Sequence, residues 1–388
     1  MSVAISPDGT KAYVANRGSA GTPSGLSVIS LANDTLGTPI PIPDSLLKSV
    51  AFQPNGNKAY VTEDSNGDMT VISGDTVAST VNLGDYMGFD SVTFSPDGTK
   101  AYATSFLGSV LAVISVATNT VTKTVDIPDV GLVDAAFSPD GTKAYLATAI
   151  GDTLTVMNTS NDTVAETITL PVIASRSVTV TPDGTKAYVT SDMFDTVSVI
   201  DLATNSVSTL TFSSRVQPVD VAVTPDGKKA IVIGNSDVVL VVDVATDTVT
   251  STLSLPEHSE PTSVAITSDS SKAYVSNAGS STVSVVTLKG ITSVPRALAT
   301  GPRTSTSMTL RWRAPEDKDG GVITDFTVQY RQTGTTDWVT FAHTASTLKR
   351  QTVTGLTANT RYEFRVAAKT SVGTSVFTEP VTKSTSRR

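Results

Sequence analysis

The sequence predicts an all-β protein with two regions, of which the first is a ring of seven β-sheets. Three observations support this. The stretch Ser-Pro-Asp-Gly-Thr-Lys-Ala-Tyr, first found at residues 6–13, occurs in seven exact or altered copies. The prolines of successive copies, with Ser268 in place of Pro in the last, are separated by 47 residues, then 42, and then 43 in each of the four remaining intervals. Each period holds four short β-branched or aromatic runs and no segment with helical periodicity. At Val294 the repeat stops, and a second region begins.

The repeated stretch has the chemistry of a β-hairpin. Its Pro presets φ for a turn, its Asp suits the next position, and its Gly accepts a positive φ without a Cβ clash. Strand-like runs flank it, such as 92–94 before and 101–103 after. A third run such as 196–201 and a fourth such as 120–125 complete the unit. Four strands repeated seven times predict a seven-bladed β-propeller, because the alternative, a stacked solenoid, rarely uses four-stranded meanders of this length.

The two ends of the repeat region are incomplete. The last unit offers three strands, at 263–266, 272–276 and 282–287, and Met1 leads directly into the first strand of the first unit, without a signal peptide. Because propellers hide their open sheet edges, we expect either a three-stranded final blade or a native chain that continues upstream with a further strand and a secretion signal. A strand after Gly290 that paired with the last blade would contradict this.

The composition limits the chemistry available to the chain. There is no cysteine, which excludes disulfides and thiolate sites, and the two histidines, His258 and His343, lie in different regions, which excludes a multi-His metal centre. The loop 64–68 alternates oxygen ligands as calcium loops do, but Met69 stands where such a loop needs Gly. We therefore expect no metal and no cofactor. No apolar run is long enough to span a membrane.

Charge is divided unevenly along the chain. Residues 1–290 carry 14 Lys and Arg against 29 Asp and Glu, whereas residues 291–388 carry 14 against 7. An acidic propeller is poorly suited to a nucleic-acid backbone. The basic region could contact an anionic wall polymer or the propeller itself, or the division could be a plain difference in surface composition.

Two family resemblances follow from these motifs. The core Pro-Asp-Gly-Thr-Lys-Ala-Tyr-Val, with Val-Ser-Val-Ile-Asp downstream, resembles the YVTN family of β-propeller repeats over residues 1–289. After a linker at 290–294, residues 295–388 resemble a fibronectin type III domain, an immunoglobulin-like β-sandwich, most specifically at 355–366. This second resemblance implies that Trp312 fills the core and that Leu356 and Tyr362 form a tyrosine corner. No Arg-Gly-Asp triplet is present to support integrin-type adhesion.

Comparison of the seven units with one another separates two faces of the propeller. The Pro-Asp-Gly face is nearly uniform, whereas the loops between second and third strands and between blades are diverse and carry aromatic residues and methionine. Drift in unconstrained loops would also produce diversity, but exposed apolar groups indicate an interaction surface. Its candidate residues are Tyr86, Phe89, Phe106, Met193, Phe194 and Arg215.

A second candidate site lies where the inner strands begin. The first residue of each is small and polar, namely Ser2, Ser49, Ser91, Asp134, Ser177, Asp220 and Ser263, and this ring should surround the mouth of the central channel. The candidate ligand-binding residues there are Lys48, Asp90, Ser91, Asp134, Arg176, Asp220 and His258. A small polar ligand, a water cluster or a cation would suit such a ring. The alternative is that these side chains only cap strand starts around a water-filled channel.

Signals for catalysis are weak, and no catalytic residue is assigned. The chain has no Gly-x-Ser-x-Gly elbow, and carboxylate-pair chemistry can be located only by geometry. We therefore predict a non-enzymatic, monomeric binding or scaffold protein of a prokaryotic cell surface or secreted fraction, with protein or cell-wall polysaccharide as partner. One alternative is a lactonase-like hydrolase, which requires Asp134, Arg176, Asp220 and His258 to converge on one pocket with perturbed pKa values. Another is that the propeller stabilises a surface layer and binds no ligand.

Overall fold

The computed structural model describes residues 1–18, 24–43, 45–64, 67–84, 88–128, 131–212, 214–288, 294–315, 322–370 and 374–387. These residues form β-strands and turns and contain no helix, which confirms the all-β class. The chain divides into two compact units, the first made of Met1–Val249 and Leu253–Val286 and the second of Thr250–Thr252 and Thr287–Arg388.

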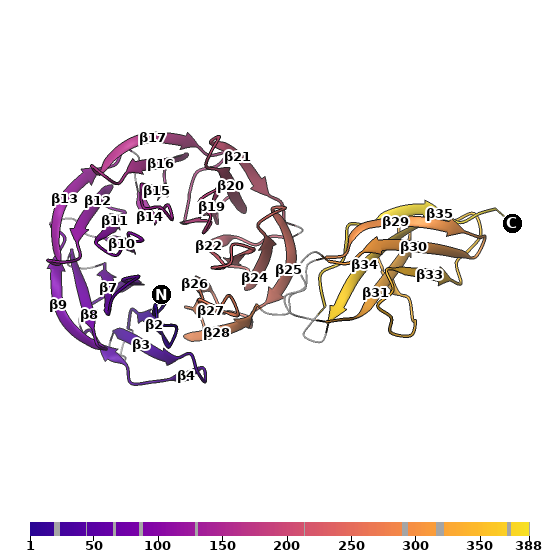
Figure 1. The fold of residues 1–388 in the computed structure, drawn as a ribbon, viewed down its shortest axis with the longest axis horizontal. Coiled ribbons are helices and arrows are strands. Elements are labelled where there is room, and N and C mark those ends of the chain that lie inside the picture. The colour runs from indigo at the N-terminus through magenta and orange to yellow at the C-terminus, as the bar shows by residue number, and fades with distance from the viewer. Residues whose placement is uncertain are drawn as a thin grey trace. The chain divides into compact units, whose positions relative to one another are not determined.

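The first unit is a ring of seven antiparallel sheets, each built from strands that follow one another in the chain (Figure 1). Sheet 1 contains β1 (Ser2–Ile5), β2 (Lys11–Asn16), β3 (Gly25–Ser30), β4 (Thr35–Leu36) and β5 (Ile40–Pro41). Sheets 2 and 3 contain β6 (Leu47–Phe52), β7 (Lys58–Glu63), β8 (Asp68–Ser73) and β9 (Thr76–Asn82), then β10 (Phe89–Phe94), β11 (Lys100–Ser105), β12 (Val110–Ser115) and β13 (Thr120–Asp126).

The remaining sheets continue the same order. Sheets 4 and 5 contain β14 (Leu132–Phe137), β15 (Lys143–Thr148), β16 (Thr153–Asn158) and β17 (Thr163–Thr169), then β18 (Ser177–Val180), β19 (Lys186–Ser191), β20 (Thr196–Asp201) and β21 (Ser206–Leu210). Sheets 6 and 7 contain β22 (Pro218–Val223), β23 (Lys229–Gly234), β24 (Val238–Asp243) and β25 (Thr248–Ser254), then β26 (Pro261–Ile266), β27 (Lys272–Asn277) and β28 (Thr282–Thr287).

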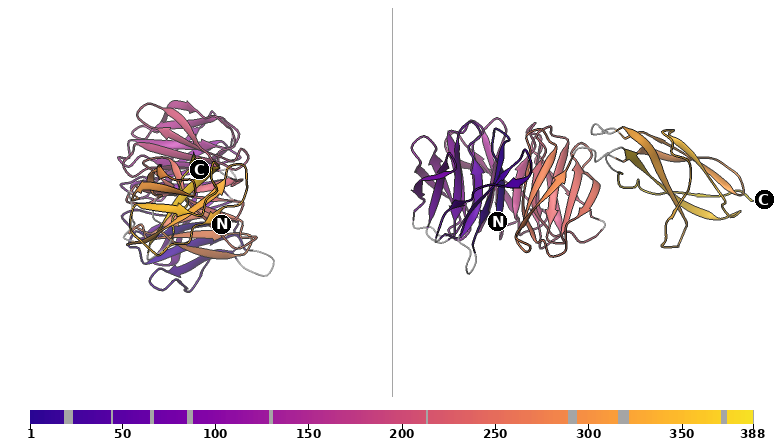
Figure 2. Two further views of the ribbon diagram at one scale, coloured as in Figure 1. Left: turned by 90° about the vertical axis from the view of Figure 1, so that its right-hand side faces the viewer. Right: turned by 90° about the horizontal axis from the view of Figure 1, so that it is seen from below.

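The inner strands close the ring. Each inner strand contacts those of the two neighbouring sheets, and β26 of the last sheet contacts β1 of the first. Seen from the side, the strands run between two faces at which the turns gather (Figure 2). We call the face with the Pro-Asp-Gly turns the turn face, and the face with the loops between second and third strands and between sheets the loop face.

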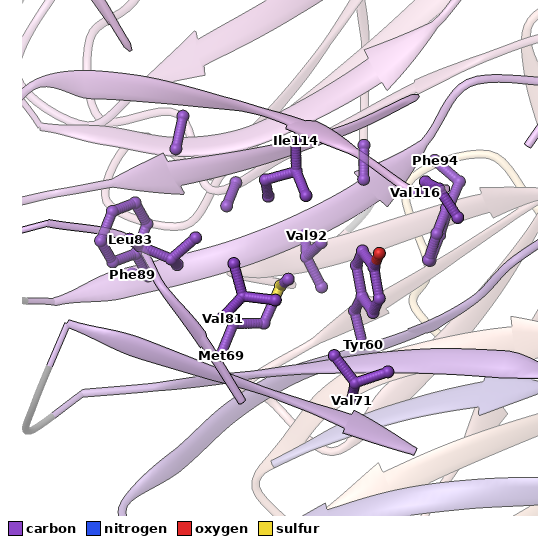
Figure 3. Close-up of a cluster of buried hydrophobic side chains, with 13 residues drawn as sticks. Tyr60, Met69, Val71, Val81, Leu83, Phe89, Val92, Phe94, Ile114 and Val116 are labelled. Carbon is purple, nitrogen blue, oxygen red and sulfur yellow. The ribbon is translucent and has the colours of Figure 1, made fainter. Parts of the chain in front are cut away.

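Apolar side chains fill the space between adjacent sheets. Between sheets 2 and 3, Tyr60 and Met69 of one sheet pack with Phe89 and Phe94 of the other, and all are buried (Figure 3). The ring centroids of Tyr60 and Phe94 lie 4.7 Å apart, and the same pairing of a motif Tyr with the next sheet's aromatic residue recurs as Tyr13–Phe52 and Tyr102–Phe137. Such tilted aromatic contacts stabilise the sheet interface beyond the area they bury.

The Pro-Asp-Gly turn is held by its own side chains. In sheet 3, the Ser95 hydroxyl donates to Asp97 Oδ1 at 2.6 Å, and the Thr99 amide donates to the same oxygen at 3.1 Å. These bonds favour the ionised carboxylate, so the pKa of Asp97 is lowered. Gly98 adopts φ +69°, the conformation for which the motif needs glycine. The conserved spacing of the motif is therefore explained by the turn itself.

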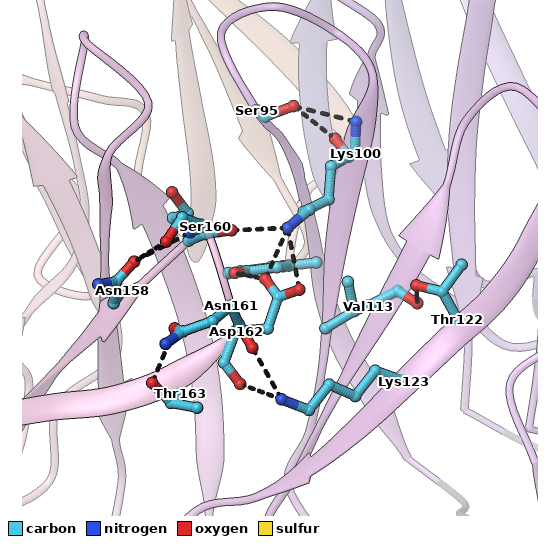
Figure 4. Close-up of polar contacts among 12 residues, drawn as sticks. Ser95, Lys100, Val113, Thr122, Lys123, Asn158, Ser160, Asn161, Asp162 and Thr163 are labelled. Atoms are coloured by element: carbon cyan, nitrogen blue, oxygen red, sulfur yellow. Dashed lines mark hydrogen bonds and ion pairs between the residues drawn. The ribbon is translucent and has the colours of Figure 1, made fainter.

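The Lys and Tyr of the motif fasten each sheet to the next one. In sheet 3, Lys100 forms an ion pair of 2.7 Å with Asp162, and the Tyr102 hydroxyl donates to the same carboxylate (Figure 4). Asp162 lies in the turn between the third and fourth strands of sheet 4, at φ +51°. Equivalent contacts join Lys11 and Tyr13 to Asp75, Lys58 and Tyr60 to Asn119, Lys186 and Tyr188 to Asp247, and Lys272 and Tyr274 to Asp34. We call this contact the inter-sheet latch.

Sheet 7 differs from the others in the described residues, because it has three strands. Among the described residues, no turn and fourth strand follow β28 as they follow the third strands of the other sheets. In sheet 6 the motif Tyr is replaced by Ile231, which is fully buried.

The second unit is a sandwich of two sheets. One contains β29 (Arg296–Arg303), β30 (Ser307–Arg313) and β33 (Arg350–Thr354), and the other contains β32 (Val339–Thr340), β31 (Ile323–Gln332), β34 (Arg361–Thr370) and β35 (Val381–Ser384). Trp312 lies in the core against Phe326, with ring centroids 5.2 Å apart. The Tyr362 hydroxyl accepts a hydrogen bond of 3.0 Å from the Thr357 amide, which confirms the expected tyrosine corner.

Candidate functional site

A polar cavity lies at the centre of the ring, at the ends of the inner strands on the loop face. Its volume is about 310 Å³. Of the seven residues predicted for the channel mouth, six line it: Lys48, Asp90, Ser91, Asp134, Arg176 and Asp220. The structure brings these together because each lies within the first three residues of an inner strand or, for Arg176, immediately before one.

His258, the seventh residue predicted for the channel mouth, is not among the residues that line this cavity. Its side chain is exposed, and its backbone amide donates to Asp237 Oδ2 at 2.9 Å. The residue lies in the connection that leads to β26, at φ +63°. Of the four residues that the hydrolase alternative requires, three therefore line one cavity, namely Asp134, Arg176 and Asp220.

Asp134 joins three sheets. Ser91 Oγ of sheet 3 donates to Asp134 Oδ1 at 2.8 Å, and the Val178 amide of sheet 5 donates to Asp134 Oδ2 at 3.0 Å. Each carboxylate oxygen therefore holds one neighbouring sheet, which keeps the side chain in a single orientation.

Asp220 repeats this arrangement two sheets further on. It accepts from Ser177 Oγ of sheet 5 at 2.7 Å and from the Val264 amide of sheet 7 at 2.8 Å. Two serines at the equivalent positions of sheets 7 and 1 accept longer contacts of the same kind. The Val3 amide lies 3.4 Å from Ser263 Oγ, and the Val50 amide lies 3.4 Å from Ser2 Oγ. The polar ring is thus first of all a set of bonds between sheets.

The two cations of the cavity are paired with carboxylates. Lys48 of sheet 2 lies 3.0 Å from Asp90 of sheet 3 and 3.5 Å from Asp64. Arg176 lies 3.4 Å from Asp192, and half of its side chain remains exposed. Arg176 is therefore the cation best placed to meet a molecule entering the cavity.

Burial shifts the pKa values of the cavity carboxylates upwards. The pKa of Asp134 is raised to about 6, chiefly because the carboxyl group is buried, and the charge of Asp220 adds to the rise. Burial also raises the pKa values of Asp220 and Asp90. Hydrogen bonds to these carboxylates lower the same pKa values, but the effect of burial is larger. Such carboxylates favour a cationic or proton-donating ligand. Within the described residues, no group of three His, Asp or Glu side chains is arranged to hold a metal ion.

The loop face carries exposed apolar side chains on one side of the ring. Met193 is 75% exposed and Phe194 is 47% exposed, in the loop between β19 and β20. Phe106 is half-buried and Arg215 is exposed, so both reach the surface. Phe89 does not: it is fully buried between sheets 2 and 3, because it begins β10 and faces the sheet interface. Tyr86 lies outside the described residues.

Sequence reasoning missed three exposed residues on this face. Leu107 is 68% exposed and Ile150 is 57% exposed, both in loops between second and third strands, and Ile173 is exposed in the connection between sheets 4 and 5. Phe106 and Ile150 both lie next to Gly131, which places these two side chains near each other. A comparison of each loop position across the seven units would have found them, because aliphatic residues stand there in place of polar turn residues. With Met193 and Phe194, these three residues form what we call the apolar arc, over sheets 3 to 5.

Comparison with known proteins identifies the second unit. Residues 293–384 match the Fibronectin type III domain family. The C-terminal unit is a fibronectin type III domain. A segment of 83 residues, 21% of the chain, is 31% identical to Protein turtle of Drosophila melanogaster, of which this chain spans 5%.

Among solved structures, the chain is similar in fold to Kuenenia stuttgartiensis Hydrazine Synthase. The TM-score is 0.65 at 18% identity, over 74% of this chain and 94% of that one. At this identity the likeness concerns the fold alone. In the described part of the chain, there is no helix with the length and apolar character needed to cross a membrane.

Proposed function

We propose that this chain is a non-enzymatic binding or scaffold protein of a prokaryotic cell surface or secreted fraction. In this proposal, residues 1–289 are a seven-bladed β-propeller of the YVTN type, residues 290–294 are a linker, and residues 295–388 are the fibronectin type III domain. The closed ring of seven antiparallel sheets and the repeated turn support the propeller assignment. Fibronectin type III domains commonly take part in protein binding, which is consistent with this role.

The apolar arc carries the proposal. Large apolar side chains exposed on one face of a protein are unfavourable in water and often mark a contact surface. Five of them, Leu107, Ile150, Ile173, Met193 and Phe194, lie on the loop face of three consecutive sheets. By contrast, the turn face is built from Pro-Asp-Gly turns whose polar groups form hydrogen bonds within the turn itself. The partner therefore contacts the loop face, and we expect it to be a protein or the apolar face of a cell-wall polysaccharide.

A variant of the arc tests this assignment. Leu107→Ser, Ile150→Ser, Met193→Ser and Phe194→Ser would be combined in the full chain, and envelope and secreted components would be passed over immobilised native and variant protein. The control carries Val77→Ser and Val164→Ser, exposed valines on the outer strands. A component retained by the native chain and the control but lost from the arc variant supports the proposal. Equal retention by all three proteins contradicts it.

The cavity supports a second candidate function, hydrolysis of a small polar substrate such as a lactone. The observation in its favour is the pair Asp134 and Asp220 with raised pKa values beside the exposed Arg176. Against it, the oxygens of both carboxylates already bind neighbouring sheets. We expect no lactone or ester turnover above that of buffer. Turnover abolished by Asp134→Asn in a folded variant would favour the hydrolase instead.

A further inference from the structure

The central cavity holds charges of both signs that do not neutralise one another. Its two cationic side chains, Lys48 and Arg176, each pair with another aspartate. Two further carboxylates of the lining, Asp134 and Asp220, form no ion pair within the described part of the chain. They also repel each other, which contributes to the raised pKa of Asp134. Buried carboxylates are unfavourable without a cation nearby, so a positive charge brought into the cavity beside them would be stabilised.

Asp134 can accept a hydrogen bond from such a cation. Its two oxygens are already bound by the Ser91 hydroxyl and by the backbone amides of Val178 and Ala135. A carboxylate has about four acceptor positions, so one more donor can be accommodated. Asp220 is more fully occupied by hydrogen bonds, and we expect it to act mainly through its charge.

Arg176 offers the opposite charge in the lining of the same cavity. Its closest approach to a carboxylate is 3.4 Å, from Nε to Asp192 Oδ2, and half of its side chain is exposed. A well-formed ion pair of this kind has a separation of about 2.8 Å. Among the described residues, the Arg176 side chain donates no hydrogen bond. Its planar guanidinium group can therefore bind a carboxylate through two parallel hydrogen bonds.

We propose that the central cavity binds a small zwitterion, an amino acid with a primary ammonium group, whose ammonium contacts Asp134 and whose carboxylate contacts Arg176. The cavity volume of about 310 Å³ is at the small end of the range for ligand sites. A quaternary ammonium group is disfavoured, because it is usually held by aromatic rings and the described lining contains none. A polar ligand would instead meet hydroxyl and amide side chains, namely Ser49, Asn235, Thr262 and Ser263.

This inference goes beyond the proposed function and does not depend on it. The described lining of the cavity includes no member of the apolar arc. If the experiment on the arc failed, the zwitterion site would be unaffected, and the reverse also holds. Binding a zwitterion requires no chemical step, so it is compatible with the absence of hydrolysis.

The test uses the full chain and a series of unbranched amino acids, from glycine through β-alanine and γ-aminobutyrate to ε-aminohexanoate. The series varies the separation of the two charges, and calorimetry at neutral pH and low salt identifies the member that binds most tightly. Two further probes have the same chain length as that member: the amine without the carboxylate, and the carboxylate without the amine. Each should bind at least tenfold more weakly, because each loses one charged contact.

Two variants remove one contact each, Asp134→Asn for the ammonium and Arg176→Gln for the carboxylate. The matched controls are Asp152→Asn and Arg215→Gln, which make the same charge changes at exposed positions of the loop face outside the lining. The affinity for the best amino acid should fall roughly tenfold or more in each cavity variant and less than threefold in each control. The unfolding midpoint of each variant checks its folding. If Asp134→Asn did not fold, Arg176→Gln, which changes a half-exposed side chain, would decide alone.

Three results would overturn the proposal. The first is that no member of the series binds the native chain. The second is that the amine or the carboxylate alone binds as tightly as the amino acid, which would indicate a simple cation or anion site. The third is an equal loss of affinity in the cavity variants and in their controls, which would indicate diffuse charge on the loop face.

Discussion

Tyr188 donates a hydrogen bond of 2.7 Å to Asp247, a residue 59 positions later in the chain and in the next sheet. Lys186 binds the same carboxylate at 2.6 Å. The repeated Lys-Ala-Tyr is thus a contact between units as well as part of a strand. Where the latch forms, a single residue of the neighbouring sheet receives both groups, so the motif joins two sheets.

The first prediction concerns this latch. Tyr188→Phe removes the hydroxyl and leaves Asp247 without one of its donors, so the free energy of unfolding should fall by about 1 to 3 kcal/mol. Tyr145→Phe is the matched control, since within the described residues the Tyr145 hydroxyl has no hydrogen-bond partner, although its ring is buried. Urea denaturation measures both. Equal losses in the two variants would show that the latch contributes nothing.

The second prediction concerns the pH dependence of stability. The pKa of Asp134 is about 6 in the folded chain, above its ordinary value of 3.8. The folded state therefore holds this proton more tightly than the unfolded state, so the stability contributed is fully present below about pH 4 and is lost as the pH rises through 6. The difference is about 3 kcal/mol.

Asp134→Asn tests this. The variant has no carboxylate to titrate, so its stability relative to the native chain should rise by about 3 kcal/mol between pH 4 and pH 7. Comparing the two proteins at each pH cancels the titration of the turn carboxylates, such as Asp8, whose pKa is lowered to about 2 by hydrogen bonds from Ser6 and Thr10. A constant difference between the proteins across this range would contradict the prediction.

The third prediction compares equivalent valines in two third strands. Val199 of β20 is 4% exposed within the core between sheets 5 and 6. Val285 of β28 is 41% exposed, because no strand of the described residues pairs with the outer edge of β28. Val199→Ala should cost about 2 kcal/mol of unfolding free energy. Val285→Ala should change it by less than about 0.5 kcal/mol. A large loss in the second variant would mean that another strand covers β28 in solution.

The fourth prediction concerns Gly131, which lies under the apolar arc. It adopts φ +80°, and a Cβ there would stand 2.9 Å from Phe106 Cε2. Gly131→Ala should therefore lower the free energy of unfolding in two ways, through backbone strain at a positive φ and through displacement of the Phe106 ring. Gly74→Ala should introduce backbone strain only, since Gly74 has φ +59° and open space around it.

We expect a loss of about 1 kcal/mol in unfolding free energy for Gly74→Ala and at least twice that for Gly131→Ala. Cleavage after Phe106 by chymotrypsin should become faster only in the Gly131 variant. If the two variants were equally stable and equally resistant, Phe106 would not be fixed by Gly131.

Much of the fold could be predicted from the sequence, because the decisive interactions are local. In the turn formed by Ser95, Asp97 and Thr99, the hydrogen bonds join residues within a stretch of five, so the turn can be predicted from the sequence alone. The alternation of apolar and polar residues then places the strands, and the repeat sets their number. The tyrosine corner at Tyr362 is local in the same way.

The candidate site could be predicted only in part. Six of the seven predicted channel-mouth residues line the cavity, because they hold one of two adjacent register positions in the repeat. His258 belongs to a connection of irregular length, where no repeated position indicates its direction. Phe89 was assigned to a loop, but it begins β10 and is buried. Burial at a strand end depends on the neighbouring sheet, which the local sequence does not contain.

The sequence by itself determined the seven hairpin units, their strands and the fibronectin type III domain, since these follow from local backbone preference and side-chain periodicity. Tertiary structure alone decided which residues meet across sheets: the pairing of Tyr188 with Asp247 and the two hydrogen bonds of Asp134. The physical reason is that these contacts join residues far apart in the chain, so their partners are set by the packing of whole sheets and by strand register.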